Sequence, residues 1–205
     1  MNVLAIHPEN PQLRLVRQAV ERLEQGGVIA LPTDACYALA CMIGDKSGAE
    51  RIRRLRQVDD SHHLTLLCRD LSELGLYAKV DNSAFRLMKA LTPGPYTFIL
   101  PATREVPRRL QHPKRRTVGL RVPDSQVVQA LLAELGAPLM SATLRLPGDA
   151  HPLSEPWEMA ERLGAQVDAI VDSGAGNLEA TTVIDLTGST PEVLRQGLGP
   201  VDFLD

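Results

Sequence analysis

A short apolar run that ends at a proline predicts a buried strand and the position where that strand stops. Gly27-Val-Ile-Ala30 reads as a buried strand, and Pro32, which has no backbone N–H to donate, ends strand pairing soon after it. A hydroxyl, a carboxylate and a phenol follow at Thr33, Asp34 and Tyr37. Because α/β sheets bind ligands where their strands end, this segment is either a ligand-binding edge or a plain polar turn.

Helical and extended segments alternate over the first part of the chain, and extended segments gather near its end. Each predicted helix follows a residue that can cap it, namely Asn10, Asp45, Asp70, Asp81, Asp124 and Ser154. The predicted strands cover residues 28–31, 63–68, 96–100, 117–122, 138–142, 169–171, 182–186 and 192–195. This order predicts a single α/β domain over residues 1–205, with a mixed sheet and flanking helices.

Composition and motifs exclude several classes of protein. No stretch approaches the roughly 20 apolar residues that cross a bilayer, and residues 1–7 lack the basic and apolar regions of a signal peptide. We therefore expect a cytoplasmic protein with no membrane partner. Neither a Walker phosphate loop nor a GxGxxG fingerprint is present. The net charge of −3 argues against wholesale coating of nucleic acid, but it allows a local basic face.

Side chains that usually bind metals are few and scattered. His62 and His63 stand beside Asp59 and Asp60, where an exposed turn is favoured over a metal site. The cysteines are too few and too unevenly spaced for a zinc site or a disulfide framework. We expect reduced, mostly buried thiols at Cys36, Cys41 and Cys68.

Two groups of arginines occupy positions that suit anionic ligands. Arg54 and Arg56 end the second predicted helix, where they either extend into solvent or clamp a phosphate. Positions two apart point to different sides of a helix, so both reach one site only if the helix breaks near Leu55. Arg121 interrupts an apolar strand, and a buried guanidinium needs either an internal acid such as Asp34 or a substrate carboxylate.

Seven short motifs follow one another along the chain. They are Pro32-Thr-Asp-Ala-Cys-Tyr-Ala-Leu39, Arg54-Leu-Arg56, Pro93-Gly-Pro-Tyr-Thr97, Arg121-Val-Pro123, Ser141-Ala-Thr143, Thr181-Thr-Val-Ile-Asp185 and Leu194-Arg-Gln-Gly197. In this order the set resembles the YrdC family of threonylcarbamoyl-AMP synthases, and more closely its YciO-like branch. The corresponding family motifs read P-T-[ED]-T-x-Y-G-L, K-x-R, P-G-P-x-T, R-x-P, S-x-N, S-T-[VI]-[VI]-D and L-R-x-G. The resemblance extends from about Gly26 to Gly197.

The resemblance implies a fold and a reaction. The fold of the family is a single α/β domain, in which a twisted mixed sheet has a concave, positively charged face. The reaction joins L-threonine, bicarbonate and ATP into threonylcarbamoyl-adenylate and releases pyrophosphate, and its product feeds t6A formation at position 37 of tRNA. Positioning and charge stabilisation carry such a reaction, so no covalent nucleophile is expected. The chain ends soon after Gly197, so we expect no counterpart of the C-terminal domain of longer relatives.

Carried over motif by motif, the resemblance implies two groups of ligand-binding residues. Those expected to line the phosphates and nucleoside of ATP are Arg54, Arg56, Ser141, Thr143 and Arg195. Those expected to hold threonine are Thr33, Thr181 and Arg121, with Arg121 on the carboxylate. Mg²⁺ is expected to bridge the phosphates, and no protein ligand for a metal is assigned.

Three positions depart from the motifs of the synthases. Arg54 replaces the lysine of K-x-R, Thr143 replaces the asparagine of S-x-N, and Ala35 replaces a threonine of the first motif. A hydroxyl lacks the paired donor and acceptor of an amide. The pattern is that of the YciO-like branch, and it is compatible with a low synthase rate.

A basic run indicates an alternative function, the binding of double-stranded RNA or tRNA. Between residues 104 and 116 the only acid is Glu105, and the cations are Arg104, Arg108, Arg109, Lys114, Arg115 and Arg116. Phosphate contacts of this kind need no base reading, although the run is equally compatible with a solvated loop. The absence of interleaved aromatic residues removes a stacking platform for single strands. Only an enzyme would release pyrophosphate in a manner that depends on threonine and bicarbonate.

Overall fold

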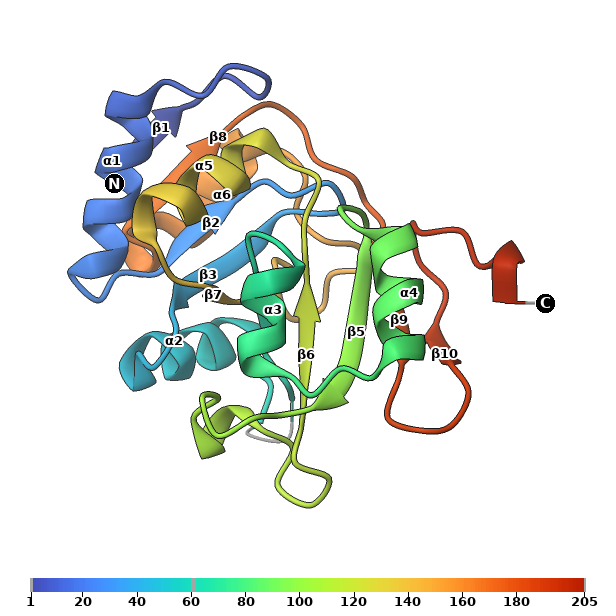
Figure 1. The fold of residues 1–205 in the computed structure, drawn as a ribbon. Helices are drawn as coiled ribbons and strands as arrows, with labels where there is room; N and C mark the ends of the chain where they lie inside the picture. Colours follow the sequence, from blue (N-terminus) through green and yellow to red (C-terminus); the bar gives the residue numbers. More distant parts are fainter. Residues whose placement is uncertain (1, 60–61, 205) are drawn as a thin grey trace.

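One mixed sheet runs through the whole fold, as a computed structural model describing residues 2–59 and 62–204 shows (Figure 1). Within these residues ten strands pair in the order β1-β8-β2-β3-β7-β4-β6-β5-β9-β10. The strands are β1 (Val3–Ala5), β2 (Ile29–Leu31), β3 (Ala38–Met42), β4 (Thr65–Leu67), β5 (Tyr96–Pro101), β6 (Thr117–Arg121), β7 (Leu139–Thr143), β8 (Ala169–Asp172), β9 (Thr182–Asp185) and β10 (Glu192–Arg195). Parallel and antiparallel pairs alternate irregularly, which confirms the predicted mixed α/β fold.

Six α-helices in the same residues flank the sheet. They are α1 (Leu13–Glu24), α2 (Lys46–Arg56), α3 (Leu71–Tyr77), α4 (Asn82–Leu91), α5 (Gln126–Leu135) and α6 (Pro156–Leu163). As predicted, α2, α3 and α4 begin at Asp45, Asp70 and Asp81, whose carboxylates accept N–H groups of the first turn. No helix in the described ranges is long and apolar enough to cross a membrane.

Three predicted helix starts were early by one or two residues. Helix α5 is capped by Ser125 rather than Asp124, because the Ser125 hydroxyl accepts from the N–H of the third helical residue. Helices α1 and α6 begin after Gln12 and Glu155, and neither residue makes a side-chain cap. The Gln12 amide oxygen instead accepts from the backbone N–H of His7, which fixes the loop before the helix.

Strands β1 and β3 were not among the predicted strands. Strand β3 contains small apolar residues with no alternation of polar and apolar side chains, and it follows the polar motif directly. It pairs antiparallel with both β2 and β7 in the middle of the sheet. The long-range pairing, rather than a local pattern, therefore makes this segment a strand.

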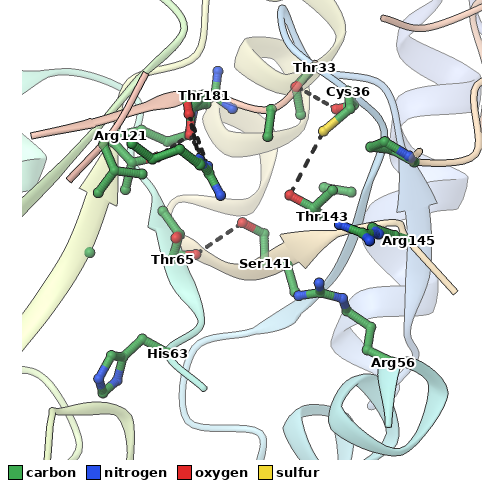
Figure 2. Close-up of a pocket in the computed structure, with 18 of the residues that line it drawn as sticks. Thr33, Cys36, Arg56, His63, Thr65, Arg121, Ser141, Thr143, Arg145 and Thr181 are labelled. Carbon is green, nitrogen blue, oxygen red and sulfur yellow. Dashed lines mark hydrogen bonds between the residues drawn. The ribbon is translucent and has the colours of Figure 1, made fainter. Parts of the chain in front are cut away.

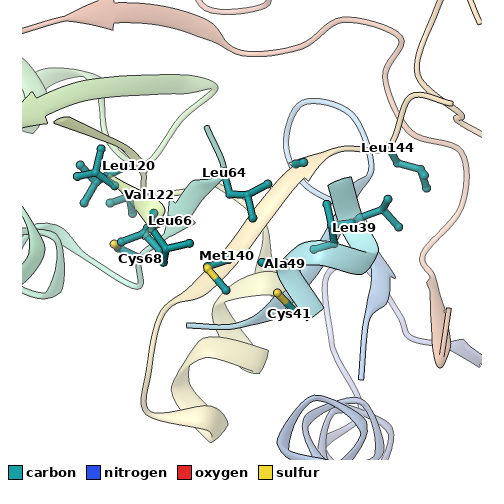
Figure 3. Close-up of a cluster of buried hydrophobic side chains, with 14 of the residues drawn as sticks. Leu39, Cys41, Ala49, Leu64, Leu66, Cys68, Leu120, Val122, Met140 and Leu144 are labelled. Atoms are coloured by element: carbon teal, nitrogen blue, oxygen red, sulfur yellow. The ribbon is translucent and has the colours of Figure 1, made fainter. Parts of the chain in front are cut away.

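The two faces of the sheet are covered unequally. One face packs against α2, α3, α4 and α6 through apolar side chains that include Ile52, Leu74, Met88 and Leu163. Figure 3 shows part of this core, in which Leu66, Met140 and Leu120 come from neighbouring strands. The three cysteines are free and buried, as predicted.

Helices α1 and α5 pack against the opposite face through residues such as Val16 and Leu131. They contact each other and cover the end of the sheet that contains β1, β8, β2 and β3. The rest of this face, over β7, β4, β6, β5 and β9, forms a cavity instead. The uneven covering therefore determines where a ligand has access to the sheet.

Candidate functional site

A cavity of about 530 Å³ lies on the open part of the sheet (Figure 2). Alternate residues of five strands and the start of β9 form its floor, namely Ala38, Thr65, Leu67, Thr97, Ile99, Gly119, Arg121, Ser141, Thr143, Thr181 and Val183. The register places Thr65 between Ser141 and Gly119, so these residues form one row across the sheet. A Cβ at Gly119 would lie only 3.4 Å from side-chain atoms of Thr65 and Thr97, so glycine keeps this row open.

Among the described residues, no Asp or Glu side chain lines this cavity. The basic and imidazole side chains there are Arg56, Arg121, Arg145, Arg195, His62, His63 and His151. Hydroxyls of serine and threonine supply most of the other polar groups. This arrangement is the concave basic face that the resemblance predicted, and it suits ligands with several negative charges.

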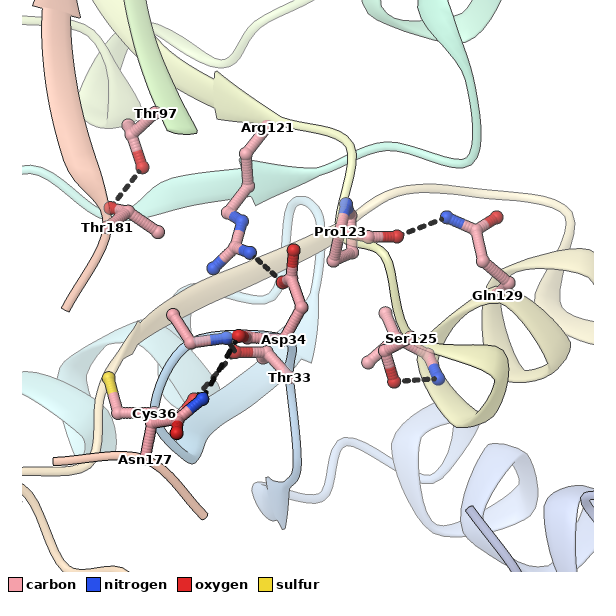
Figure 4. Close-up of polar contacts among 12 residues, drawn as sticks. Thr33, Asp34, Cys36, Thr97, Arg121, Pro123, Ser125, Gln129, Asn177 and Thr181 are labelled. Atoms are coloured by element: carbon pink, nitrogen blue, oxygen red, sulfur yellow. Dashed lines mark hydrogen bonds and ion pairs between the residues drawn. The ribbon is translucent and has the colours of Figure 1, made fainter. Parts of the chain in front are cut away.

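Arg121 is paired with an internal acid, which was one of the two partners considered from the sequence. Its Nη2 donates to Asp34 Oδ1 (Figure 4), and the two side chains are only 7 % and 11 % exposed. Burial lowers the pKa of Arg121, and the charge of Asp34 opposes that change. The Arg121 Nε has no hydrogen-bond partner in the described part of the chain, although it is buried. Asp34 therefore pairs with only part of the Arg121 guanidinium, and Arg121 also lines the cavity.

Thr33 fixes the turn that carries the first motif. Its hydroxyl donates to the carbonyl of Cys36 at 2.7 Å and accepts from the N–H of Ala35 at 3.0 Å. The Cys36 thiol in turn lies 3.8 Å from the Thr143 hydroxyl. Because the Thr33 hydroxyl has already donated its hydrogen, it can offer a ligand only an acceptor. Burial raises the pKa of the Cys36 thiol, so this group is neutral near pH 7.

Thr181 and Arg195, which both line the cavity, contact each other. The Thr181 hydroxyl is 2.8 Å from that of Thr97 (Figure 4), and its carbonyl accepts from Arg195 Nε and Nη2 at 3.1 and 2.9 Å. The guanidinium of Arg195 is therefore oriented by backbone from the strand beside it. Ser141, on the cavity floor, donates to the carbonyl of Thr65 at 3.0 Å.

Arg56 enters the cavity from the end of α2, and it contacts His62. Its Nη1 lies 2.7 Å from His62 Nε2. Because a guanidinium only donates, His62 accepts through Nε2, and the imidazole is the neutral form protonated on Nδ1. Burial, followed by the charge of Arg56, lowers the pKa of His62, which agrees with this form.

The prediction of an exposed turn at His62 and His63 was wrong, because both imidazoles are partly buried and line the cavity. His63 also packs against His112, with ring centroids 4.9 Å apart and the ring planes tilted by 43°. Asp60 lies outside the described residues. In residues 2–59 and 62–204, no three His, Cys, Asp or Glu side chains are grouped so that they could hold a metal.

Arg54 does not reach the cavity with Arg56. Helix α2 continues unbroken through Leu55, so the two arginines point to different sides of it. Arg54 lines a separate groove with Leu146 and Arg162, between α2 and α6. The break that would have brought both arginines to one site is absent from this described helix.

Several lining residues were not identified from the sequence. Arg145 could have been found by alternation, because positions 141, 143 and 145 lie on one side of the β7 segment. Thr97 was part of a quoted motif but was given no role. His151 comes from the loop before α6, and no local pattern indicates its position.

The predicted RNA-binding residues lie apart from the cavity, in the connection between β5 and β6. Arg108 and Arg109 belong to a short 3₁₀ helix, and Arg109 donates to the carbonyl of Gly44. The remaining three are exposed in a turn, at Lys114, Arg115 and Arg116. His112 closes this turn, because its Nδ1 accepts from two backbone N–H groups there.

Comparisons with known proteins agree with the motifs. The family model Sua5_yciO_yrdC, described as "Telomere recombination", matches residues 21–197. A protein of Escherichia coli (strain K12) named "Uncharacterized protein YciO" is 57 % identical over 196 residues, which cover 96 % of this chain and 95 % of that protein. The crystal structure of E. coli YciO has a TM-score of 0.96 and 55 % sequence identity, with all of both chains covered.

Relatives with a named activity are more distant. A threonylcarbamoyl-AMP synthase of Vibrio vulnificus (strain YJ016) is 31 % identical over 89 % of this chain and 98 % of its own length. The crystal structure of P. abyssi Sua5 complexed with L-threonine has a TM-score of 0.88 and 26 % identity, over 96 % of this chain and 58 % of that one. With a family model matching most of its length, this chain belongs to the Sua5/YciO/YrdC family.

Proposed function

We propose that this protein is an enzyme of the threonylcarbamoyl-AMP synthase type. It would join L-threonine, bicarbonate and ATP, release pyrophosphate, and supply threonylcarbamoyl-adenylate for t6A formation in cytoplasmic tRNA. The observation that carries the proposal is a cavity lined by Arg56, Arg121, Arg145 and Arg195 and, among the described residues, by no carboxylate. All three substrates carry negative charge, and a cavity with several guanidinium groups and no described carboxylate favours anionic ligands.

The threonine end of the site is proposed at Arg121. Its guanidinium, which lines the cavity, would donate to the carboxylate of threonine, while the bond to Asp34 holds it in place. The Thr33 hydroxyl retains an acceptor for the substrate ammonium group. The Thr181 hydroxyl, just before β9, would contact the rest of the amino acid.

The nucleotide end of the site is proposed around Arg56 and Arg195. Their guanidinium groups would bind phosphate oxygens, because guanidinium forks match phosphate geometry. Ser141 and Thr143 lie on the floor of the same cavity and would contact the nucleotide through their hydroxyls. Charge stabilisation by these groups in a partly enclosed cavity would lower the barrier without a covalent intermediate.

The described lining does not fit a resident Mg²⁺ ion. Mg²⁺ binds carboxylate and other oxygen ligands, and no Asp or Glu among the described residues lines the cavity. The proposed reaction therefore assigns no step to a metal held by this chain. Any Mg²⁺ would be bound by the phosphates of ATP as part of the substrate.

The test is incubation with ATP, threonine and bicarbonate, followed by mass spectrometry of the adenylate and measurement of pyrophosphate. Adenylate that requires both threonine and bicarbonate supports the proposal. Pyrophosphate release independent of either compound contradicts it.

A second proposal, the binding of double-stranded RNA or tRNA, is favoured by the exposed turn that contains Lys114, Arg115 and Arg116. These cations are outside the cavity, so they would contact phosphates without blocking the proposed active site. Such binding would bring a tRNA to the protein, or it would be the only function if adenylate is not formed.

A further inference from the structure

We infer that Arg145, and not Arg54, supplies the second guanidinium that binds the phosphates of a nucleoside triphosphate beside Arg56. The identity of the ligand rests on the proposed function, but the assignment of the residue rests on the geometry. Arg145 lies two residues beyond Thr143, and both line the cavity. Figure 2 shows Arg145 and Arg56 at the same side of the cavity, next to Thr143.

The electrostatic environment of this pair is incomplete without an anion. After burial, the charge of Arg145 is the largest cause that lowers the pKa of Arg56, so the two guanidinium groups repel each other. Arg56 donates to the neutral His62, and its buried Nε–H has no partner in the described chain. No described carboxylate lines the cavity to compensate these charges. A phosphate group placed between them would supply the missing negative charge.

Arg145 is held in position by backbone, which leaves part of its guanidinium for a ligand. Its Nε donates to the carbonyl of Asp149 at 2.9 Å. The Asp149 carboxylate is occupied elsewhere, because both of its oxygens accept from Arg162 on α6 at 2.9 Å. The ion pair with Arg162 therefore fixes the loop that orients Arg145 without neutralising it.

Arg54 occupies the position of the family's lysine but cannot play this part in the observed geometry. It lines the groove between α2 and α6 rather than the cavity. The second cation in the cavity is therefore Arg145, which follows β7, whereas the motif would supply it from position 54 on α2.

The test is calorimetric titration with ATP, pyrophosphate and adenosine. The variants are Arg145→Gln, Arg56→Gln, the double variant and Arg54→Gln, with Arg14→Gln on the exposed side of α1 as a matched loss of charge. Arg145→Gln is expected to lower the affinity for ATP and for pyrophosphate at least about tenfold, because a charge-assisted contact is lost. Adenosine affinity should not change. The double variant should lose less than the product of the two single losses.

Three results would overturn the inference: wild-type affinities for ATP and pyrophosphate in Arg145→Gln, an equal loss in Arg54→Gln or Arg14→Gln, or an equal loss for adenosine. A wild type that binds neither ATP nor pyrophosphate also overturns it. Failure of the proposed function is distinguishable, because a protein that binds pyrophosphate through Arg145 yet forms no adenylate retains this inference and loses only the synthase reaction.

Discussion

Removal of the Arg121 guanidinium is expected to destabilise the protein unless Asp34 is neutralised at the same time. The two side chains are 7 % and 11 % exposed, and one Asp34 oxygen already lacks a partner among the described residues. Arg121→Met would leave the carboxylate buried without its cation. Breaking a buried pair in this way costs about 3–5 kcal/mol. For a chain of 205 residues this loss corresponds to a fall in Tm of roughly 6–20 °C.

The double variant Arg121→Met/Asp34→Asn removes both charges and should recover most of the lost stability. We expect a coupling energy of at least about 2 kcal/mol between the two substitutions. The assay is urea unfolding of the wild type, both single variants and the double variant. Arg17→Met is the matched control, because it breaks an ion pair with Glu134 in which the side chains are 62 % and 31 % exposed. Its effect should stay below about 1 kcal/mol.

Threonine separates a structural role of Arg121 from a role in binding. In the wild type, threonine should raise the Tm, because a ligand that binds only the folded state stabilises it. The double variant Arg121→Met/Asp34→Asn, although its stability is restored, should show no rise in Tm with threonine. If the single and double variants are equally unstable, the buried-pair reasoning is refuted. If the double variant responds to threonine like the wild type, Arg121 does not bind the substrate carboxylate.

Three further predictions concern other parts of the molecule. Thr143→Asn should raise adenylate formation several-fold in a timed mass-spectrometric assay, because an amide adds a hydrogen bond worth about 0.5–1.5 kcal/mol. An unchanged rate would show that Thr143 does not limit adenylate formation. Replacing Lys114, Arg115 and Arg116 by Ser should flatten the salt dependence of any RNA binding in filter assays, and an unchanged slope would place the contact elsewhere. Because burial raises the pKa of Cys36, its alkylation by iodoacetamide should be slow at pH 7 and faster as the pH rises toward that pKa; rapid reaction of the folded protein at pH 7 would contradict this.

The sequence predicted the elements whose signals are local. Asp45, Asp70 and Asp81 marked helix starts correctly, because an acid before a helical apolar pattern acts within one turn. Strand β3 was missed, because its pairing with β2 and β7 depends on segments distant in the chain. The fold class itself followed from the order of elements and from the ordered motifs.

The candidate site was predictable only in part. Thr33, Arg121 and Thr181, which the motifs assign to one ligand, line one cavity. Arg54 lies in a separate groove. A motif gives the order of residues but does not show on which side of a helix each one lies. Arg145 was not considered, although the alternation of positions 141, 143 and 145 is consistent with its place in the same cavity as Arg56.

The most direct test of the proposed function is mass-spectrometric detection of threonylcarbamoyl-adenylate after incubation of the purified protein with ATP, threonine and bicarbonate. The cavity without carboxylates and its arginines predict a product that disappears when threonine or bicarbonate is omitted. Arg56→Gln should lower its yield at least about tenfold. If a folded wild-type protein that binds ATP forms no adenylate under these conditions, the synthase proposal is contradicted.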